Sequence, residues 1–288
     1  AFSPDGRFLY ASGGGDECIL VWRMNGMSAS PDSAILLKNQ GAPAKLFPSG
    51  IAVSRDGGTM YVAENRGDCV SRVSIGKRSV EKRIPTPAGS FPYDIRIAQS
   101  RSKLYVSLWG ASAVSVIDGR EFALKKSIPI CDHPNAMLLN ADESLLYVAC
   151  ANTDDVWVID TATDTVLETI DLHPYPNAPY GSTPNGLALS SDGSVLYVAN
   201  ATNNDIAVVD VSKRGASVIR GLIPVGWYPT ALAMDSGGGK LYAANGKGLV
   251  SKPNPKGPNP VNGTGNAEYI GGLFNGTVSS IPIPDAKK

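Results

Sequence analysis

The residue types that most readily do chemistry are scarce in this sequence. Its only two histidines, His133 and His173, each stand directly before a proline. Together with Glu64 they could hold one metal ion, because imidazole and carboxylate groups are common metal ligands. Alternatively, Glu64, Arg66 and His133 could supply a base and oxyanion partners for hydrolysis. Two histidines without an HExxH-like spacing are a weak signal, so we favour a histidine packed in an X-Pro turn and assign neither a metal nor a catalytic residue.

Composition excludes several further classes of function. The sequence has no GxSxG nucleophile motif and no CxxCH haem motif, so we expect no cofactor. Lysine plus arginine equals aspartate plus glutamate, 26 each, so the chain has no net positive charge that would attract a nucleic acid. No run of eighteen apolar residues occurs, so we expect no membrane span.

The sequence contains an internal repeat, and a repeat of fixed period indicates the fold class. Its strands must position the candidate residues named above. Tyr10 begins a series of tyrosines spaced 42 to 51 residues apart. Each later tyrosine follows a proline by thirteen residues, in the pairs Pro48 and Tyr61, Pro92 and Tyr105, Pro134 and Tyr147, Pro184 and Tyr197, and Pro229 and Tyr242.

Each repeat predicts four antiparallel strands. In the unit after Pro184, a short strand over 185–190 is followed by Asp192-Gly193, a strong hairpin signal, and then by strands over 195–200 and 205–210. A fourth strand is predicted at positions such as 165–170. Aspartates thirteen residues after the tyrosine are predicted to cap the turn into that fourth strand; they are Asp118, Asp160 and Asp210.

Four antiparallel strands every 40 to 50 residues are typical of a β-propeller blade. We therefore predict an all-β protein with a single β-propeller domain over 1–288. The blades are predicted at about 1–40, 41–86, 87–130, 131–174, 175–225 and 226–285. Neither the first nor the last unit is a complete blade, so we expect a seven-bladed parent, with a six-bladed ring as the alternative. The sequence begins inside a repeat motif, and we expect it to be a fragment of a longer chain.

The first strands alternate small and large apolar residues. Small residues occur at Gly50, Ala52, Gly186, Ala188, Ala231 and Ala233. Because blades stack face to face, we interpret this alternation as the filling of a wedge between sheets. Asp94 and Arg96 replace small residues in one strand, and we interpret them first as an ion pair that fills the wedge, and second as a charged site lining the channel.

One rim of the propeller carries most of the candidate binding residues. The loop that enters each first strand and the loop between the second and third strands lie at this rim, where small-molecule sites tend to occur. The candidate ligand-binding residues are Asn135, His173, Asn185, Asn200, Trp227, Tyr228, Asn245 and Lys247. The alternative for the asparagines is that they satisfy the main chain of their own blade.

The last blade contains a long insertion at the same rim. Residues 246–272 add about 27 residues between its second and third strands, and loops longer than roughly 15 residues are usually functional or disordered. Trp227 and Tyr228 could stack on a sugar ring or a peptide, or plug a gap beneath this insertion. The Pro-rich part of the insertion could dock on them as a lid or link to a partner.

The four cysteines form no CxxC motif. Cys18 and Cys69 occupy equivalent positions in adjacent blades, and the spacing of about 10 Å between face-packed sheets is too large for a disulfide. Cys131 and Cys150 lie at one rim of one blade and are the only plausible pair. We nevertheless expect buried free thiols.

Two segments, LYVACANTDDVWVID and LYVANATNNDIAVVD, resemble the YVTN-type β-propeller repeat of bacterial surface-layer-like proteins. A narrower resemblance is carried by CDHPNAMLL, LHPYPNAPYGSTPNGLALS and VGWYPTALAMDSGGGKLYAANGKGL. These segments are similar to the propeller of bacterial two-domain proteins in which a YVTN propeller precedes an alkaline-phosphatase-type phosphoesterase domain. The resemblance implies a phosphoesterase beyond Lys288 and an extracytoplasmic location, periplasmic or secreted. The clustered ligands of a two-metal phosphatase are not found in 1–288.

The sequence therefore favours a non-catalytic recognition or scaffolding domain that is accessory to a phosphoesterase domain. Candidate partners at the channel mouth are a small molecule, a glycan or a protein. The alternative is a lactonase-like propeller hydrolase that uses Glu64, Arg66 and His133, because propellers of similar repeat type include sugar-lactone hydrolases.

Overall fold

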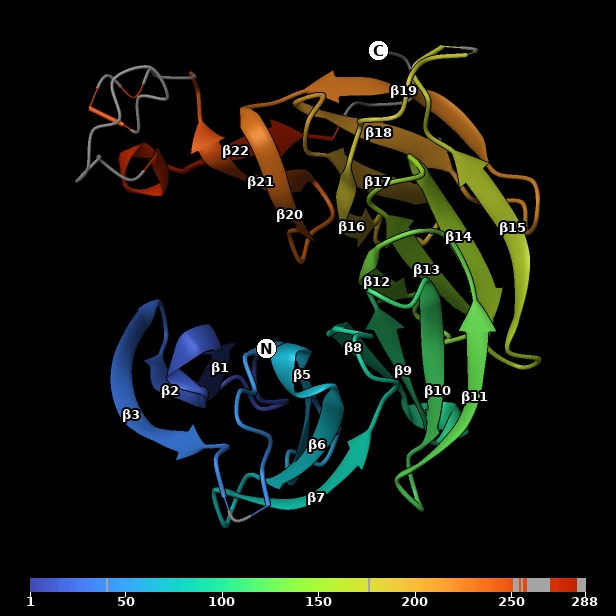
Figure 1. Cartoon of the computed structure of the whole chain (residues 1–288). Coiled ribbons are helices and arrows are strands. Elements are labelled where there is room, and N and C mark those ends of the chain that lie inside the picture. Colours follow the sequence, from blue (N-terminus) through green and yellow to red (C-terminus); the bar gives the residue numbers. More distant parts are fainter. Residues whose placement is uncertain (40, 176, 251–253, 255, 258–269, 284–288) are drawn as a thin grey trace. The chain divides into compact units, whose positions relative to one another are not determined.

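The computed structural model describes residues 1–39, 41–175, 177–250, 254, 256–257 and 270–283. In these residues 22 strands form six antiparallel sheets, and strands that follow one another in sequence are neighbours in the sheet. The sheets are the blades of a β-propeller, so the predicted fold class is confirmed (Figure 1). None of the helices in the described ranges is long and apolar enough to cross a membrane. The chain divides into two compact units, Ala1–Thr169 and Ile170–Lys288.

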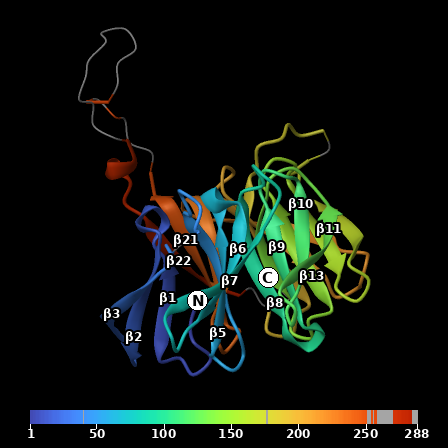
Figure 2. The same ribbon diagram turned by 60° about the horizontal axis from the view of Figure 1, so that its bottom comes forward.

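The first unit contains blades one to three and blade four as far as Thr169, within its last strand. Blade one consists of β1 (Phe8–Ser12), β2 (Cys18–Asn25) and β3 (Ser28–Leu36). Blade two consists of β4 (Pro48–Val53), β5 (Thr59–Glu64), β6 (Cys69–Ser74) and β7 (Ser79–Pro85). Blade three consists of β8 (Pro92–Ala98), β9 (Lys103–Leu108), β10 (Ala113–Asp118) and β11 (Ala123–Pro129), which lie side by side in Figure 2. Blade four consists of β12 (Pro134–Leu139), β13 (Leu145–Cys150), β14 (Asp155–Asp160) and β15 (Thr165–Asp171). Three short 3-10 helices join strands in this unit: η1 (Gly14–Asp16), η2 (Asn65–Gly67) and η3 (Gln99–Arg101).

The second unit contains blades five and six. Blade five consists of β16 (Pro184–Leu189), β17 (Val195–Asn200), β18 (Asp205–Asp210) and β19 (Val218–Pro224). Blade six consists of β20 (Trp227–Met234), β21 (Lys240–Gly248) and β22 (Thr277–Pro282). The 3-10 helix η4 (Ile270–Leu273) lies between β21 and β22. Most of the predicted insertion at 246–272 lies outside the described residues.

The two terminal blades have three strands each in the described residues, which agrees with the prediction that neither is a complete blade. Tyr10 lies on β1, whereas Tyr61 lies on the second strand of blade two. Blade one therefore contributes the second to fourth strands of a blade, and blade six contributes the first to third.

Aspartate side chains fix the turns between consecutive strands of a blade. Asp192 accepts hydrogen bonds from the hydroxyl of Ser190 (2.6 Å) and the backbone N–H of Ser194 (3.0 Å), which hold the pKa of its carboxyl at about 2. Gly193 follows with a φ of 72°, a conformation that suits glycine. The predicted caps are also confirmed, because backbone N–H groups two residues onward donate to Asp118, Asp160 and Asp210.

The core consists of apolar layers between successive blades. In the first unit, Ile19 of β2 packs in one cluster with Met60 and Val62 of β5. The opposite face of β5 carries Tyr61, which joins a second cluster with residues of blade three. Since both faces of β5 are covered, this strand lacks a polar face.

Gly50 shows how closely the first strands approach. A Cβ atom at this position would lie 2.7 Å from Cα of Asp94 and 2.8 Å from the carbonyl oxygen of Tyr93, both on β8. In the second unit a Cβ on Gly186 would lie 3.2 Å from Cα of Ala231. The small residues therefore permit β4 to pack on β8 and β16 to pack on β20.

Replacing Gly50 with alanine is expected to lower the free energy of unfolding by about 1 to 3 kcal/mol, because the neighbours are backbone atoms that cannot rotate away. The matched control is Gly221→Ala on β19, where a Cβ would meet nothing within 4 Å. Urea denaturation followed by circular dichroism measures both. Equal stability of the two variants would contradict this account of blade packing.

Asp94 and Arg96 also join two blades. Their ion pair has an N–O distance of 2.8 Å, and Asp94 accepts a hydrogen bond from the backbone N–H of Met137 on β12 (2.8 Å). Arg96 donates to the carbonyl oxygen of the same residue. The first interpretation, an ion pair that fills the wedge, is confirmed.

Candidate functional site

The loop that enters the first strand contains the same unusual turn in five blades. The residue before each repeat proline has a positive φ, between 47° and 59°. A residue before proline normally adopts an extended conformation, and a non-glycine residue with positive φ is uncommon. Four of the five carry a ring: the residues are Phe47, Phe91, His133, Thr183 and Tyr228.

Hydrogen bonds hold these turns in place. The backbone N–H of Trp109 donates to the carbonyl oxygen of Phe91 (3.2 Å), and that of Ala151 donates to the carbonyl oxygen of His133 (3.2 Å). The preceding blade adds a side chain, since Asp68 accepts a hydrogen bond from the N–H of Phe91 (3.0 Å). A strained backbone conformation persists where surrounding hydrogen bonds fix it, so the rings of these turns are attached to a rigid backbone.

Three rings meet at the rim between blades three and four. Trp109, directly after β9, has its ring centre 4.0 Å from that of His133 and 6.3 Å from that of Phe91, both in edge-on arrangements. The Trp109 side chain is still 38% exposed, and nearby on β8 the side chain of Tyr93 is 44% exposed. We call Phe91, Trp109 and His133 the Trp109 cluster.

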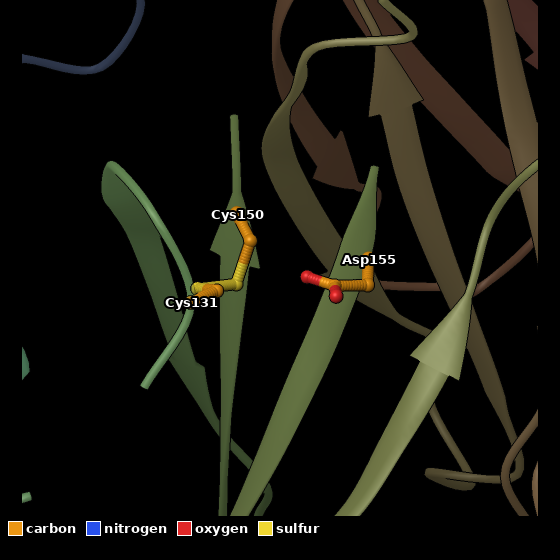
Figure 3. Close-up of side chains that lie close together, drawn as sticks. All are labelled: Cys131, Cys150 and Asp155. Atoms are coloured by element: carbon orange, nitrogen blue, oxygen red, sulfur yellow. A yellow bond between two sulfur atoms is a disulfide. The ribbon is translucent and has the colours of Figure 1, made fainter. Parts of the chain in front are cut away.

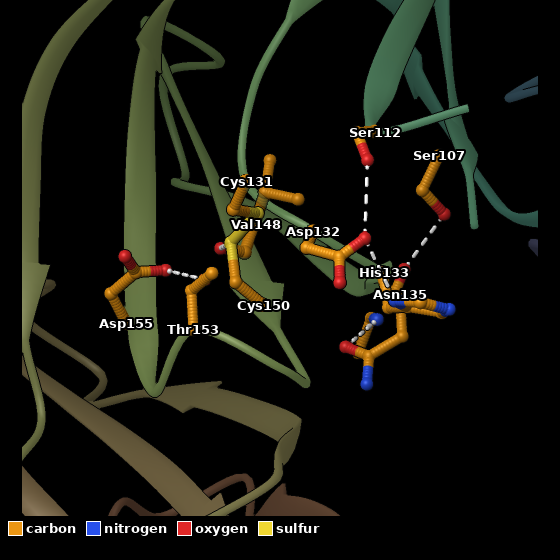
Figure 4. Close-up of a disulfide and its surroundings, with 11 residues drawn as sticks. Ser107, Ser112, Cys131, Asp132, His133, Asn135, Val148, Cys150, Thr153 and Asp155 are labelled. Atoms are coloured by element: carbon orange, nitrogen blue, oxygen red, sulfur yellow. Dashed lines mark hydrogen bonds and ion pairs between the residues drawn. A yellow bond between two sulfur atoms is a disulfide. The ribbon is translucent and has the colours of Figure 1, made fainter. Parts of the chain in front are cut away.

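His133 of the Trp109 cluster also belongs to a polar network with Asp132 and Ser112, which Figure 4 shows. Nδ1 of His133 lies 2.9 Å from Oδ1 of Asp132 and 2.7 Å from Nδ2 of Asn152. Asp132 also accepts hydrogen bonds from Ser112 (3.2 Å) and Asn152 (3.1 Å). Hydrogen bonds from Asn152 first, and then from His133 and Ser112, lower the pKa of the Asp132 carboxyl. The carboxylate lies between serine and histidine, so the imidazole does not activate the hydroxyl as a nucleophile.

A disulfide between Cys131 and Cys150 anchors the two segments that carry Asp132, His133 and Asn152. Their Cα atoms are 5.9 Å apart, within the range that a disulfide spans. The expectation of free thiols was wrong for this pair, because pairing of Pro134 with Cys150 in the β12–β13 register brings the preceding loop to the end of β13. Cys18 and Cys69 are buried free thiols, as expected.

Asp155 of β14 points its carboxylate toward the two sulfur atoms (Figure 3). Donor atoms of Cys131, Cys150 and Asp155 lie within 4.8 Å of one another, and this is the only such group of three or more in the described part of the chain. The sulfur atoms are bonded to each other, and only a thiolate is a good metal ligand. Glu64 and His133 belong to no comparable group among the described residues of the first unit, and His173 lies in the second unit.

Glu64 is fully buried and already bonded. Its carboxylate accepts hydrogen bonds from Arg83 (3.0 Å), Ser71 (2.7 Å) and Cys69 (2.8 Å). Burial first, and then the charge of Glu64, raise the pKa of the Cys69 thiol. No hydrogen bond or ion pair joins Glu64 to His133 in the described ranges. Arg66, on η2, is exposed.

Asn135 and His173 make local contacts. Asn135 is 5% exposed, and its Oδ1 accepts a hydrogen bond from the backbone N–H of Ala136 (2.6 Å), which agrees with the main-chain interpretation. In the second unit, His173 pairs with Asp171 through Nδ1, and its ring lies edge-on to Tyr180 with centres 5.1 Å apart.

Asn200 and Asn245 of the second unit behave differently, because they donate hydrogen bonds to side chains. Asn200 is fully buried and donates to Asp205 (2.9 Å), and Asn245 donates to Ser279 (2.9 Å). Burial raises the pKa of the Asp205 carboxyl, and the Asn200 hydrogen bond partly offsets this. The Oδ1 atoms of Asn185, Asn200 and Asn245 are buried and have no hydrogen-bond partner among the described residues.

Blade six carries exposed rings as well. Trp227 is 40% exposed. The ammonium group of Lys247 lies 4.2 Å from the ring centre of Tyr228, a cation–π contact. Lys247 also lines a pocket of about 190 Å³ with Leu249, Val250, Leu273, Phe274, Asn275 and Thr277.

Trp109 and its polar neighbours were missed in the sequence. The position four residues after the repeat tyrosine otherwise holds small or polar residues: Gly14, Asn65, Ala151, Ala201 and Gly246. A tryptophan in this series could have been recognised as a rim residue from the repeat register alone. Its packing on His133, by contrast, depends on the neighbouring blade.

No protein-family model matches the chain. The Leptospira interrogans protein named Antigen Lp49 is 33% identical over 142 residues, which are 42% of this chain and 31% of that protein. The Seven-bladed beta-propeller protein Rv1057 of Mycobacterium tuberculosis is 31% identical over 152 residues, 51% of this chain and 37% of that protein. The matched segments thus span less than half the length of either curated relative.

Solved structures share the fold at low sequence identity. A Bacteroides fragilis protein described provisionally as a 6-phosphogluconolactonase has a TM-score of 0.72 at 16% identity, covering 85% of this chain and 76% of that one. A protein of unknown function from Desulfotomaculum acetoxidans has a TM-score of 0.69 at 12% identity, covering 85% of this chain and 78% of that one. At these identities the similarity shows the fold alone.

Proposed function

We propose that this chain is a non-catalytic recognition domain and that it binds through the Trp109 cluster. The observation that carries the proposal is an exposed tryptophan fixed by two neighbouring rings on hydrogen-bonded turns. Rigid aromatic side chains supply contact area at little cost in conformational entropy, which is why they dominate binding surfaces.

The ionisable groups near the rim support binding rather than hydrolysis. Glu64, the candidate base, is enclosed by its partners and has no exposed surface. Ser112 donates to a carboxylate instead of to an imidazole. The lactonase-like alternative, in which Glu64, Arg66 and His133 act together at the channel mouth, would require Glu64 to leave a buried ion pair.

A hydrolysis assay separates the two functions. The purified chain, incubated with a six-membered sugar lactone or with p-nitrophenyl phosphate, is expected to give no turnover above buffer. Turnover that disappears in the His133→Ala variant, with the fold retained by circular dichroism, would overturn the proposal in favour of the hydrolase.

The disulfide supports an exported location for the domain. Disulfides persist in oxidising compartments such as the bacterial periplasm and the exterior. We propose a periplasmic or secreted protein on this ground and on the resemblance of its repeats to surface-layer-like proteins. The association with a phosphoesterase domain beyond Lys288 is part of the same proposal and is supported by the sequence resemblance alone.

A further inference from the structure

We propose that the ligand of the Trp109 cluster is a neutral saccharide, held by the indole of Trp109 and the side chains of Asp132, Asn152 and His133. This inference rests on the recognition function proposed above and adds the chemical class of the ligand. A saccharide ring offers two surfaces to a protein, an apolar C–H face and a rim of hydroxyl groups, and the site presents a partner for each.

The indole provides the partner for the C–H face. His133 and Phe91 contact Trp109 edge-on, so the orientation of the indole is fixed before any ligand arrives. Its 38% exposure leaves ring surface open to solvent. Covering this surface with the C–H face of a sugar removes apolar area from water without ordering a flexible side chain.

The polar network provides the partners for hydroxyl groups. The side chain of Asp132 is 49% exposed. Its Oδ1 accepts from Ser112 and lies within hydrogen-bond distance of His133 Nδ1, while its Oδ2 accepts only from Asn152. A carboxylate has about four acceptor positions, so Oδ2 can accept one more hydrogen bond. In the described structure, Oδ1 of Asn152 and Nε2 of His133 make no hydrogen bond and can also reach a ligand.

The charge of the site favours a neutral ligand. Asp132 is a carboxylate with a lowered pKa, which disfavours phosphates and other anions. A cationic side chain would be attracted by Asp132 and by the indole. However, Asp132 already has two hydrogen-bond donors and a histidine beside it, and one remaining acceptor position suits a hydroxyl group better than an ammonium group with three donors.

The matched variants are Trp109→Ala and Leu124→Ala. Leu124 is 46% exposed on the outer strand β11 of blade three, outside the site. Trp109→Phe keeps an aromatic ring and serves as a conservative variant in case Trp109→Ala does not fold. Circular dichroism and thermal melting show whether each variant is folded. Saturation-transfer difference NMR with the full chain would use cellopentaose, chitopentaose and maltopentaose, and separately a lysine- and arginine-rich peptide.

At least one of the three oligosaccharides is expected to bind, with dissociation constants raised tenfold or more by Trp109→Ala, less by Trp109→Phe and not at all by Leu124→Ala. Binding of the basic peptide alone, lost in Trp109→Ala, would overturn the saccharide proposal while leaving the recognition function in place. If no probe binds, or if Trp109→Ala binds as the wild type does, both the saccharide and the Trp109 cluster as a binding surface are wrong.

Discussion

Replacing Glu64 with alanine is expected to lower the free energy of unfolding by about 3 to 5 kcal/mol, the largest effect of any substitution considered. The variant leaves the guanidinium of Arg83, whose side chain is 15% exposed, without its carboxylate. It also removes the acceptor of hydrogen bonds from Ser71 and Cys69. Burying a charge without its partner is far more costly than losing a pair at the surface.

The matched control lies in the same blade. Glu81 pairs with Arg72 at 3.6 Å, with both side chains about a third exposed, and Glu81→Ala is expected to cost less than about 1 kcal/mol. Chemical denaturation of the two variants gives the comparison. Similar destabilisation by both would show that Glu64 is not a structural ion pair, and a catalytic role for its carboxylate would then regain support.

The second large effect is expected from the disulfide. Replacing both Cys131 and Cys150 with serine removes a cross-link over a sequence separation of 19 residues. Without the cross-link the unfolded chain has more conformational entropy, which is expected to lower the free energy of unfolding by about 3 kcal/mol. Because the disulfide anchors the segments that carry Asp132, His133 and Asn152, the variant is also expected to weaken binding at the Trp109 cluster (Figure 4).

Thermal melts with and without dithiothreitol check this prediction. The reductant should lower the melting temperature of the wild type toward that of the double-serine variant and leave the variant itself unchanged. A wild type whose melting temperature does not respond, although thiol titration shows that the disulfide has been reduced, would contradict a stabilising role.

The architecture was predictable because its signals are local and repeated. A proline and a tyrosine thirteen residues apart mark the first two strands of a blade, and Asp192-Gly193 marks the hairpin between them. The capping role of Asp118 followed in the same way, since an aspartate bonds to N–H groups only two or three residues onward. Such signals act within about 50 residues and need no knowledge of the neighbouring blade.

The partners of the candidate site residues could not be predicted, since they depend on contacts across strands and blades. Glu64 was a candidate base because of its position in the repeat. Its partner Arg83 lies on β7, two strands away in the same sheet. The register of β12 and β13 decided that Cys131 and Cys150 are bonded.

The repeat, the turns and the rim with the variable residues could be read from the sequence, because these follow from strand period and turn chemistry. The packing of His133 on Trp109, a residue of the preceding blade, became apparent only in the folded chain. That contact requires a left-handed backbone conformation at His133 and the stacking of two sheets. Neither feature produces a periodic pattern in the sequence.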